Sequence, residues 1–328
     1  MTTLTEATGE AAARETPARR RRRRVDHLPY LLLLPCLAII AVLLLWPLGQ
    51  VVWMSFHKLD SVRQLRGDRE WPWVGLANYA QILGDPFFRT VLRNTVLFAV
   101  ANVALTMILG TLVGLLLNRL GKKMATFVAS CVMLAWATPA LTGTIVWKWI
   151  FDDTSGLVTW LFNKLPDGLS TALFGRSDWT GYGWFNDPLM FFAILTLVVV
   201  WHSFPFIAVS VLAGLKSVPT ELQEAARVDG AGPWKVFWSV TFPILRPVFG
   251  ILVVLSTIWD FKVFTQQFVL AGGTQDRSTF MLSIYSYAEA FSPPPKYGLG
   301  SAIAVILTVI LLAVTALYVR MVLRQEDE

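Results

Sequence analysis

Residues 94–118 read NTVLFAVANVALTMILGTLVGLLLN and carry no charged side chain between Arg93 and Arg119. A helix needs about 20 consecutive, mostly apolar residues to cross the hydrocarbon core of a bilayer. This run is longer than that, and a helix satisfies its backbone hydrogen bonds within the segment, as a span in lipid requires. The stretch therefore predicts a membrane-spanning helix.

Comparable uncharged runs lie on both sides of this one. They fit a composition that is 55% apolar and 15% charged, too rich in apolar residues for a soluble domain. The apolar run after Arg246 ends early, at Asp260, so the fifth span is expected to be irregular. The sequence predicts an all-α membrane protein, a six-helix transmembrane bundle with spans at about 29–55, 94–118, 124–149, 189–213, 247–270 and 298–320.

The net charge of +6 does not indicate a nucleic-acid partner, because six arginines at 19–24 supply the whole excess. Residues 1–27 are polar and are expected to form a disordered, Arg-rich cytoplasmic tail. Cys36 and Cys131 lie in apolar stretches without metal-ligand spacing, so neither a metal site nor a disulfide is expected.

Six spans place both termini on one side of the membrane. The arginine tail, with Arg119, Lys122 and Lys123, puts that side in the cytoplasm. Because the first external loop also carries several cations, the orientation depends on the tail, on the acidic balance of the loop from Asp152 to Asp187, and on the motif described below. External loops are expected at 58–90, 152–187 and 271–297, none large enough for a compact soluble domain, and helix kinks are expected at Pro35 and Pro47.

The cytoplasmic loop at 216–247 separates the fourth and fifth spans and is expected to form two short helices. Pro219 suits a first helical turn, and Gly230 suits the left-handed residue that closes a helix. A second helix is expected to begin at Gly232–Pro233 and to stop at Pro243.

A spaced motif within this loop resembles that of a known family. Glu224-Ala225-Ala226, then three residues and Gly230, then nine residues and Val240-Thr241-Phe242-Pro243 resembles the EAA signature, E-A-A-x3-G-x9-I-x-L-P, of binding-protein-dependent ABC importer permeases. The spacing matches throughout, with apolar Val and Phe replacing Ile and Leu. The alternative is an amphipathic interfacial hairpin without a partner, which does not require these residues at these offsets.

Further segments resemble the MalF-type sugar permeases of that family, from about residue 29 to the end. These are Gly75-Leu-Ala-Asn78-Tyr79, the stretch from Ala213-Gly214-Leu215 to Asp229-Gly230-Ala231, and Val269-Leu270-Ala271-Gly272-Gly273. The sequence departs from the pattern at Thr265 and Ala271, where that branch often has Asp and Thr. The resemblance implies a type I importer permease fold over residues 28–325, in the cytoplasmic membrane of a bacterium.

The resemblance also implies how such a chain is driven. A helix of the loop would sit in a groove of an ATPase subunit, with the coupling residues Glu224, Ala225, Ala226, Asp229, Gly230 and Pro243. No G-x-x-x-x-G-K-[ST] loop occurs in the sequence, so ATP and magnesium are expected on separate subunits and the chain is not expected to be an enzyme. The implied partners are two ATP-binding subunits, a second permease subunit, with a heterodimer favoured, and an extracytoplasmic solute-binding protein.

Two polar breaks in the spans are candidates for the solute pathway. The fifth span carries Trp259, Asp260, Lys262 and Gln266, which offer the hydroxyl-matched groups and the aromatic face that a sugar needs. Buried charges in a membrane by default face a cavity or a partner. A structural ion pair, or a span that ends near Asp260, would explain them as well. The fourth span carries Trp201-His202-Ser203-Phe204-Pro205-Phe206, where Ser203 and Phe206 could line the same cavity, while His202 is expected to serve helix packing.

The expected function is therefore import of a carbohydrate, a di- or oligosaccharide, as the permease subunit of an ATP-driven importer. Glycerol 3-phosphate or another small polar solute is the alternative, since Lys262 could serve a phosphate. An ion-coupled carrier would be expected to show two inverted halves, which the sequence does not show. An intramembrane enzyme would need a buried catalytic set, and the sequence offers no Ser–Lys, Asp–Asp or His–Glu pair on facing spans.

Overall fold

The computed structural model describes residues 28–272 and 276–326. In these two stretches the chain is helical, and the only strand-like pairing is an isolated bridge between His57 and Trp73. Short turns, 3-10 segments and π segments join the helices. The α-helices are α1 (Leu28–Ile40), α2 (Trp46–Ser55), α3 (Val62–Leu65), α4 (Ala77–Gly84), α5 (Pro86–Arg119), α6 (Lys122–Ala137), α7 (Ala140–Ile150), α8 (Leu157–Phe162), α9 (Asp167–Phe174), α10 (Pro188–Leu215), α11 (Thr220–Val228), α12 (Pro233–Val236), α13 (Phe242–Phe261), α14 (Thr265–Leu270), α15 (Leu282–Phe291) and α16 (Tyr297–Glu326).

The helices confirm the predicted multi-pass architecture. Within the described residues, five helical stretches are long and apolar enough to cross a membrane, and a bent pair makes a sixth when it is counted as one span. Long, charge-free runs form these helices because only a closed hydrogen-bond ladder is tolerated in hydrocarbon.

The chain divides into two compact units, Met1–Leu48 and Gly49–Glu328. The described part of the first unit is helical from Leu28, and it leaves α-helical geometry over the π segment Ala41–Leu45. Pro47 follows shortly after this segment and supplies no N–H to the ladder. The predicted tail at 1–27 lies outside the described residues.

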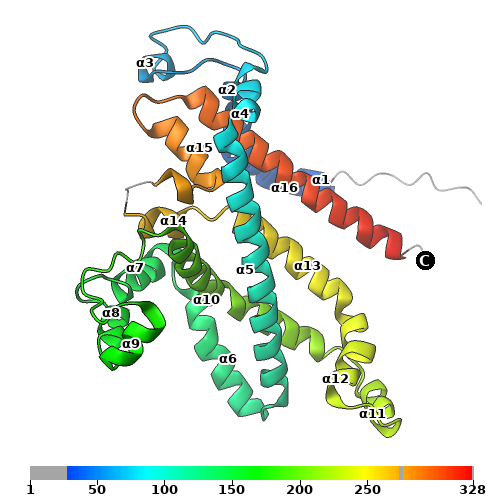
Figure 1. Cartoon of the computed structure of the whole chain (residues 1–328). Helices are drawn as coiled ribbons and strands as arrows, with labels where there is room; N and C mark the ends of the chain where they lie inside the picture. Colours follow the sequence, from blue (N-terminus) through cyan, green and yellow to red (C-terminus); the bar gives the residue numbers. More distant parts are fainter. Residues whose placement is uncertain (1–27, 273–275, 327–328) are drawn as a thin grey trace, which may run out of the picture. The chain divides into compact units, whose positions relative to one another are not determined.

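The second unit is organised around α5, which runs from the end that carries α4 to the end that carries α11 and α12 (Figure 1). Its main partner is α10, and the two helices approach closely at two glycines of α5. A Cβ at Gly110 would lie 2.6 Å from the Ile207 Cβ, and one at Gly114 would lie 2.9 Å from the Ala208 carbonyl oxygen. Small residues at a membrane helix interface allow backbones to approach in this way.

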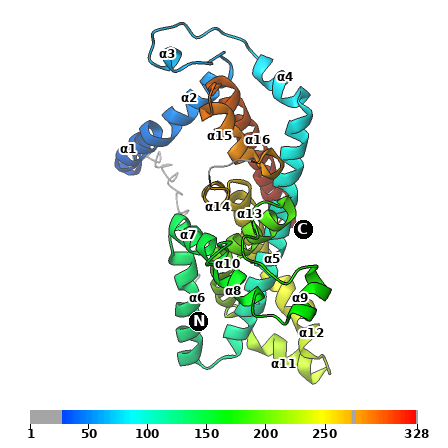
Figure 2. The same cartoon turned by 60° about the vertical axis from the view of Figure 1, so that its left-hand side comes forward.

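The expectation of one continuous helix at 124–149 is wrong. The structure has two helices there, α6 and α7, which meet at 92° across Thr138 and Pro139. Figure 2 shows α6 rising from the end near α11, and α7 turning away from it. The physical reason is Pro139, which removes an N–H and disfavours helical geometry at the residue before it.

The expectation that Pro243 stops a helix is also wrong. The chain stays helical from Pro233 through the π segment Phe237–Thr241 into α13, with Pro243 in the first turn of α13. A proline is tolerated in the first turn of a helix, and here the wider turn of the π segment directly precedes that first turn. The predicted irregularity of the fifth span is confirmed, because α13 ends at Phe261 and α14 begins only at Thr265.

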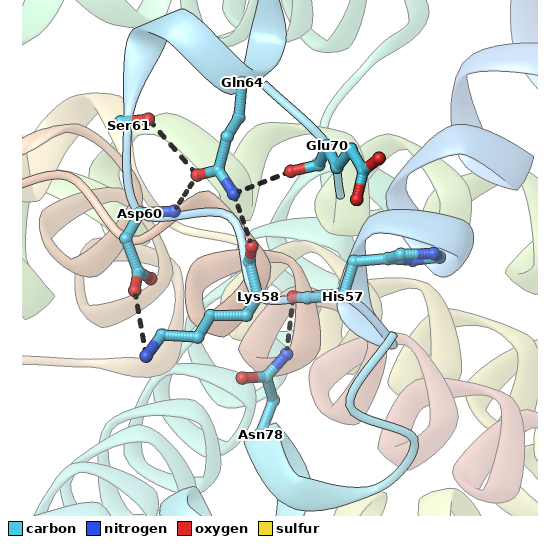
Figure 3. Close-up of polar contacts among 7 residues, drawn as sticks. All are labelled: His57, Lys58, Asp60, Ser61, Gln64, Glu70 and Asn78. Carbon is cyan, nitrogen blue, oxygen red and sulfur yellow. Dashed lines mark hydrogen bonds and ion pairs between the residues drawn. The ribbon is translucent and has the colours of Figure 1, made fainter. Parts of the chain in front are cut away.

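The loop at 57–79 is folded around the side chain of Gln64, which Figure 3 shows at the centre of a set of polar contacts. Its Nε2 donates to the carbonyl oxygens of Lys58 (2.9 Å) and Glu70 (3.2 Å), and its Oε1 accepts from the backbone N–H of Asp60 (2.8 Å). Nearby, Asn78 donates to the His57 carbonyl at 3.0 Å. One buried amide thus organises a loop with little regular structure.

The segment 152–187, predicted as a loop, contains two short helices, α8 and α9. Short helices α8 and α9 enclose Trp179 and Trp184, which stack with ring centroids 5.5 Å apart. The Asp152 carboxylate accepts from the backbone N–H of Ser155 and from Thr154, which lowers the pKa of Asp152 to about 2. Trp179 and Trp184 belong to a buried cluster that also contains Phe191 and Leu195 of α10, so the aromatic side chains pack the loop onto the helices of the second unit.

Candidate functional site

Helix α11 forms an exposed surface at one end of the second unit (Figure 1). Gly230 has φ +82°, the left-handed conformation predicted for it. The N–H of Ala231 donates to the Ala226 carbonyl and that of Gly230 to the Arg227 carbonyl, an arrangement typical of a glycine-terminated helix. The helix is therefore capped by its own chain.

The side chains of α11 are mostly turned to the exterior. Glu224, Ala225 and Asp229 are exposed and Ala226 is half-buried, while Val228 is 87% exposed. An exposed valine beside small side chains is a surface that another protein can approach closely. Pro243 lies apart from this surface, in the first turn of α13.

The polar breaks of the fourth and fifth spans meet at one cavity of about 650 Å³. Trp259, Asp260, Lys262 and Gln266 come from α13, α14 and the turn between them, and Ser203 comes from α10. A volume of this size falls within the range of about 300–1,000 Å³ that is typical of small-molecule pockets. The complete lining is Trp136, Ala137, Thr138, Pro139, Ala140, Val199, His202, Ser203, Trp259, Asp260, Lys262, Val263, Phe264, Thr265 and Gln266.

Phe206 contacts this cavity only indirectly. Its ring packs against Trp259 (centroids 5.3 Å apart) and stacks on Trp136 (5.6 Å), so it supports both tryptophans from behind. The sequence predicted that Phe206 lines the pathway. In the structure Phe206 instead packs against two tryptophans that line the cavity, so we assign it a positioning role. The structure brings together the other five pathway candidates.

A third wall of the cavity was missed by sequence reasoning. It is formed by the break between α6 and α7, from Trp136 to Ala140. The dipeptide Thr138–Pro139 is the signal that could have located it, because a proline within an uncharged run breaks the helix before it.

His202 fastens this wall to α10. Its Nε2–H donates to the Thr138 carbonyl oxygen at 3.0 Å, a group that the helix break leaves without a ladder partner. This contact agrees with the packing role expected for His202.

Lys148 joins α7 to α14 by a hydrogen bond. Its half-buried ammonium group, at the end of α7, donates to the Val269 carbonyl in the last turn of α14 at 2.9 Å. A cation is favourable at a helix C-terminus, where the last carbonyls have no ladder partner. The bond joins two short helices that both border the cavity.

Replacement of Lys148 by methionine is expected to lower the free energy of unfolding by about 1.5–3 kcal/mol, the range for a hydrogen bond to a charged group. Thermal melting of the purified protein measures this. Lys164→Met is the matched control, because the Lys164 ammonium group lies over the exposed Trp160 ring and takes part in neither ion pair of the described residues. Equal effects of the two substitutions would contradict a specific role for the bond to Val269.

The comparisons with known proteins agree with the membrane-spanning helices described above. The family model described as "Binding-protein-dependent transport system inner membrane component" matches residues 106–326. The chain is 40% identical over 314 residues to the diacetylchitobiose uptake system permease protein DasB of Streptomyces coelicolor, covering 95% of this chain and 92% of that protein. It is 31% identical to the trehalose/maltose transport system permease protein MalF of Thermococcus litoralis, covering 90% and 94%.

A solved structure is similar at the level of the fold. The structure of a bacterial ABC transporter involved in the import of alginate contains a chain with a TM-score of 0.72 and 19% identity, covering 91% of this chain and 96% of that one. With two thirds of its length matched by the family model, and several helices long enough to span a bilayer, this chain belongs to the inner-membrane permease components of binding-protein-dependent transport systems.

Proposed function

We propose that this chain is the membrane-spanning subunit of an ATP-driven importer that carries a carbohydrate, a di- or oligosaccharide, into the cytoplasm. The observation that carries the proposal is the cavity between α6, α10 and the α13–α14 break, at which Ser203, Trp259 and Gln266 converge. The relatives named for diacetylchitobiose and for trehalose and maltose support the same class of solute.

The chemistry of the lining suits a sugar. Trp136 and Trp259 line the cavity, and indole rings suit the apolar C–H faces of a pyranose. Gln266 and Ser203 supply neutral donors and acceptors for hydroxyl groups. Polar side chains placed among apolar ones fix the orientation of a ligand in such a site.

The driving force is proposed to come from outside the chain. Helix α11 would sit in a groove of an ATPase subunit, with Glu224 paired to a basic or donor group there and with Gly230 setting the direction of the helix. ATP and magnesium would be bound by two such subunits. A second permease subunit would complete the pathway, and an extracytoplasmic binding protein would deliver the solute. Both termini and α11 would then lie on the cytoplasmic side.

Glycerol 3-phosphate is the second candidate solute, favoured by one observation. Lys262 lines the cavity and is exposed, and neither ion pair found in the described part of the chain involves it. A free ammonium group is a suitable partner for a phosphate.

Reconstitution of the complete transporter in vesicles tests both candidates. Uptake of a labelled disaccharide and of labelled glycerol 3-phosphate is measured with ATP inside the vesicles and the cognate binding protein outside. Sugar uptake that requires ATP supports the proposal, and uptake of the phosphate alone would replace the sugar with the second candidate. Uptake that persists without the ATPase subunits would overturn the importer assignment.

The Trp259→Ala variant is expected to lower the kcat/KM of sugar uptake about tenfold, which corresponds to about 1.4 kcal/mol. The loss follows from removal of a ring that lines the cavity. Trp149→Ala is the matched control, because Trp149 is an exposed tryptophan of α7 that does not line the cavity. A normal kcat/KM in Trp259→Ala would place the sugar elsewhere.

A further inference from the structure

A second pocket, of about 540 Å³, is lined by residues of α14, of α15 and of the 3-10 segment Arg277–Thr279, at the end of the second unit opposite α11 (Figure 1). We call it the outer pocket. Its lining combines aromatic rings with two charged side chains and a hydroxyl group, and none of its residues lines the cavity at Asp260. The lining includes Phe268, Tyr287, Phe291, Arg277, Glu289 and Ser292.

A row of aromatic rings connects the outer pocket to the cavity. Phe264, just before α14, lines the cavity. Its ring centroid lies 5.4 Å from that of Phe268 and 5.2 Å from that of Tyr287, and both of these residues line the outer pocket. Tyr287 in turn lies 5.2 Å from Phe291, centroid to centroid. The four rings therefore form one continuous series of contacts from the cavity lining to the outer pocket.

The row is anchored in the protein core at one end and exposed at the other. Phe264 and Phe268 are half-buried and pack against a buried cluster that includes Tyr285 and Leu299. Phe291 is 60% exposed, so the core does not account for its ring. A ring that the core holds in place loses little conformational freedom when a ligand binds to it, and this favours binding.

The two charged side chains of the outer pocket are positioned by residues outside its lining. Glu289 Oε2 pairs with the Lys296 ammonium group at 3.3 Å, and the Glu289 side chain is 19% exposed. The Arg277 guanidinium carbon lies 4.3 Å from the centroid of the Phe87 ring, a cation–π contact. Guanidinium and carboxylate groups form strong, charge-assisted hydrogen bonds, so the pocket offers both a donor and an acceptor to a polar ligand.

We propose that the outer pocket is a second binding site for the carbohydrate, which the solute occupies before it reaches the cavity. This inference rests on the proposed import of a carbohydrate. The pocket volume of about 540 Å³ falls within the range of about 300–1,000 Å³ that is typical of small-molecule sites. Its aromatic rings suit the apolar C–H faces of a pyranose, while Arg277 donates to hydroxyl oxygens and Glu289 accepts from hydroxyl groups.

The aromatic row gives the sugar successive contacts between its two sites. Neighbouring ring centroids are 5.2–5.5 Å apart, so a sugar can contact the next ring before it leaves the previous one. The contact between Tyr287 and Phe264 joins the lining of the outer pocket directly to the lining of the cavity. The outer pocket therefore adds an entry site to the transport function proposed for the cavity.

The test is protection of a cysteine in the outer pocket by sugar. Ser292→Cys is introduced into the purified complete transporter after Cys36 and Cys131 have been replaced by serine. Labelling of this chain by a maleimide is followed without ATP or binding protein, in the presence of diacetylchitobiose, trehalose or maltose. At about ten times the half-protecting concentration of a bound sugar, the labelling rate is expected to fall about tenfold by mass action. Ser155→Cys is the matched control, because Ser155 is an exposed serine that does not line the pocket.

Adding Tyr287→Leu is expected to raise the half-protecting concentration about two- to tenfold, the effect of one aromatic contact. Phe174→Leu is its control, because Phe174 is an exposed aromatic residue that lines neither space. The proposal is overturned if none of the three sugars protects, or if Tyr287→Leu changes nothing. Protection by the binding protein without sugar, and none by sugar alone, would also overturn it and indicate a protein-docking surface. Uptake is measured separately: import without protection removes only the outer site, whereas protection without import removes the importer assignment.

Discussion

The Glu224→Ala variant is expected to insert and fold normally but to lose at least about 90% of ATP-driven uptake. In the described part of the chain no hydrogen bond or ion pair holds the exposed Glu224 side chain, so its removal costs the fold little. In the proposed complex the same carboxylate is buried in the ATPase groove. Loss of one partner of such a contact typically costs about 2–5 kcal/mol, enough to abolish tight docking.

The measurement is uptake in vesicles together with co-purification of the ATPase subunits. Glu221→Ala is the matched control, because Glu221 is also an exposed glutamate of α11, in its first turn. Gly230→Val is expected to give the same loss by another route, since a β-branched residue is strained at φ +82°. Normal uptake in both Glu224→Ala and Gly230→Val would show that α11 is not the docking element.

The first half of the loop at 216–247 could be predicted, because local backbone chemistry sets where its helix begins and ends. Pro219 immediately precedes α11, and Gly230 follows it in the left-handed conformation. The second half could not be predicted, because the rule that proline ends a helix places a helix terminus at Pro243. The structure has Pro243 in the first turn of α13 instead. A π segment at Phe237–Thr241 accommodates the proline instead, and no short-range pattern announces it.

The candidate cavity was predicted in part for a related reason. Charged and amide groups within an apolar run stand out in a sequence, and this identified Asp260, Lys262 and Gln266. The wall from Trp136 to Ala140 carries no charge, so a reading based on uncharged runs treats it as part of a straight span. Its contribution depends on the 92° bend at Pro139, where His202 of α10 contacts the Thr138 carbonyl oxygen.

Two buried polar side chains of α5, Asn102 and Thr106, show a different limit. Both residues lie inside the stretch 94–118. Nothing in that stretch indicates whether a buried polar side chain finds a hydrogen-bond partner or is left without one. The distinction requires the partner helix. Helical periodicity predicts which residues share one face of a helix, but not which neighbouring helix that face contacts.

The Gly110→Leu variant is expected to be the most damaging substitution for folding. A Cβ at this position would lie 2.6 Å from the Ile207 Cβ and 3.1 Å from the Phe204 carbonyl oxygen, so α5 and α10 would have to separate. Overpacking usually costs about 1–3 kcal/mol, and the cost here is expected at or above the upper limit because backbone as well as side chain obstructs the new group.

Yield of monodisperse protein and its melting temperature measure the effect. Gly49→Leu is the matched control within an apolar helix, because a Cβ at Gly49 meets nothing within 4 Å. Gly110→Ala is expected to be intermediate, since it adds only the Cβ. If Gly110→Leu melts like the control, α5 and α10 are not in close contact at this point.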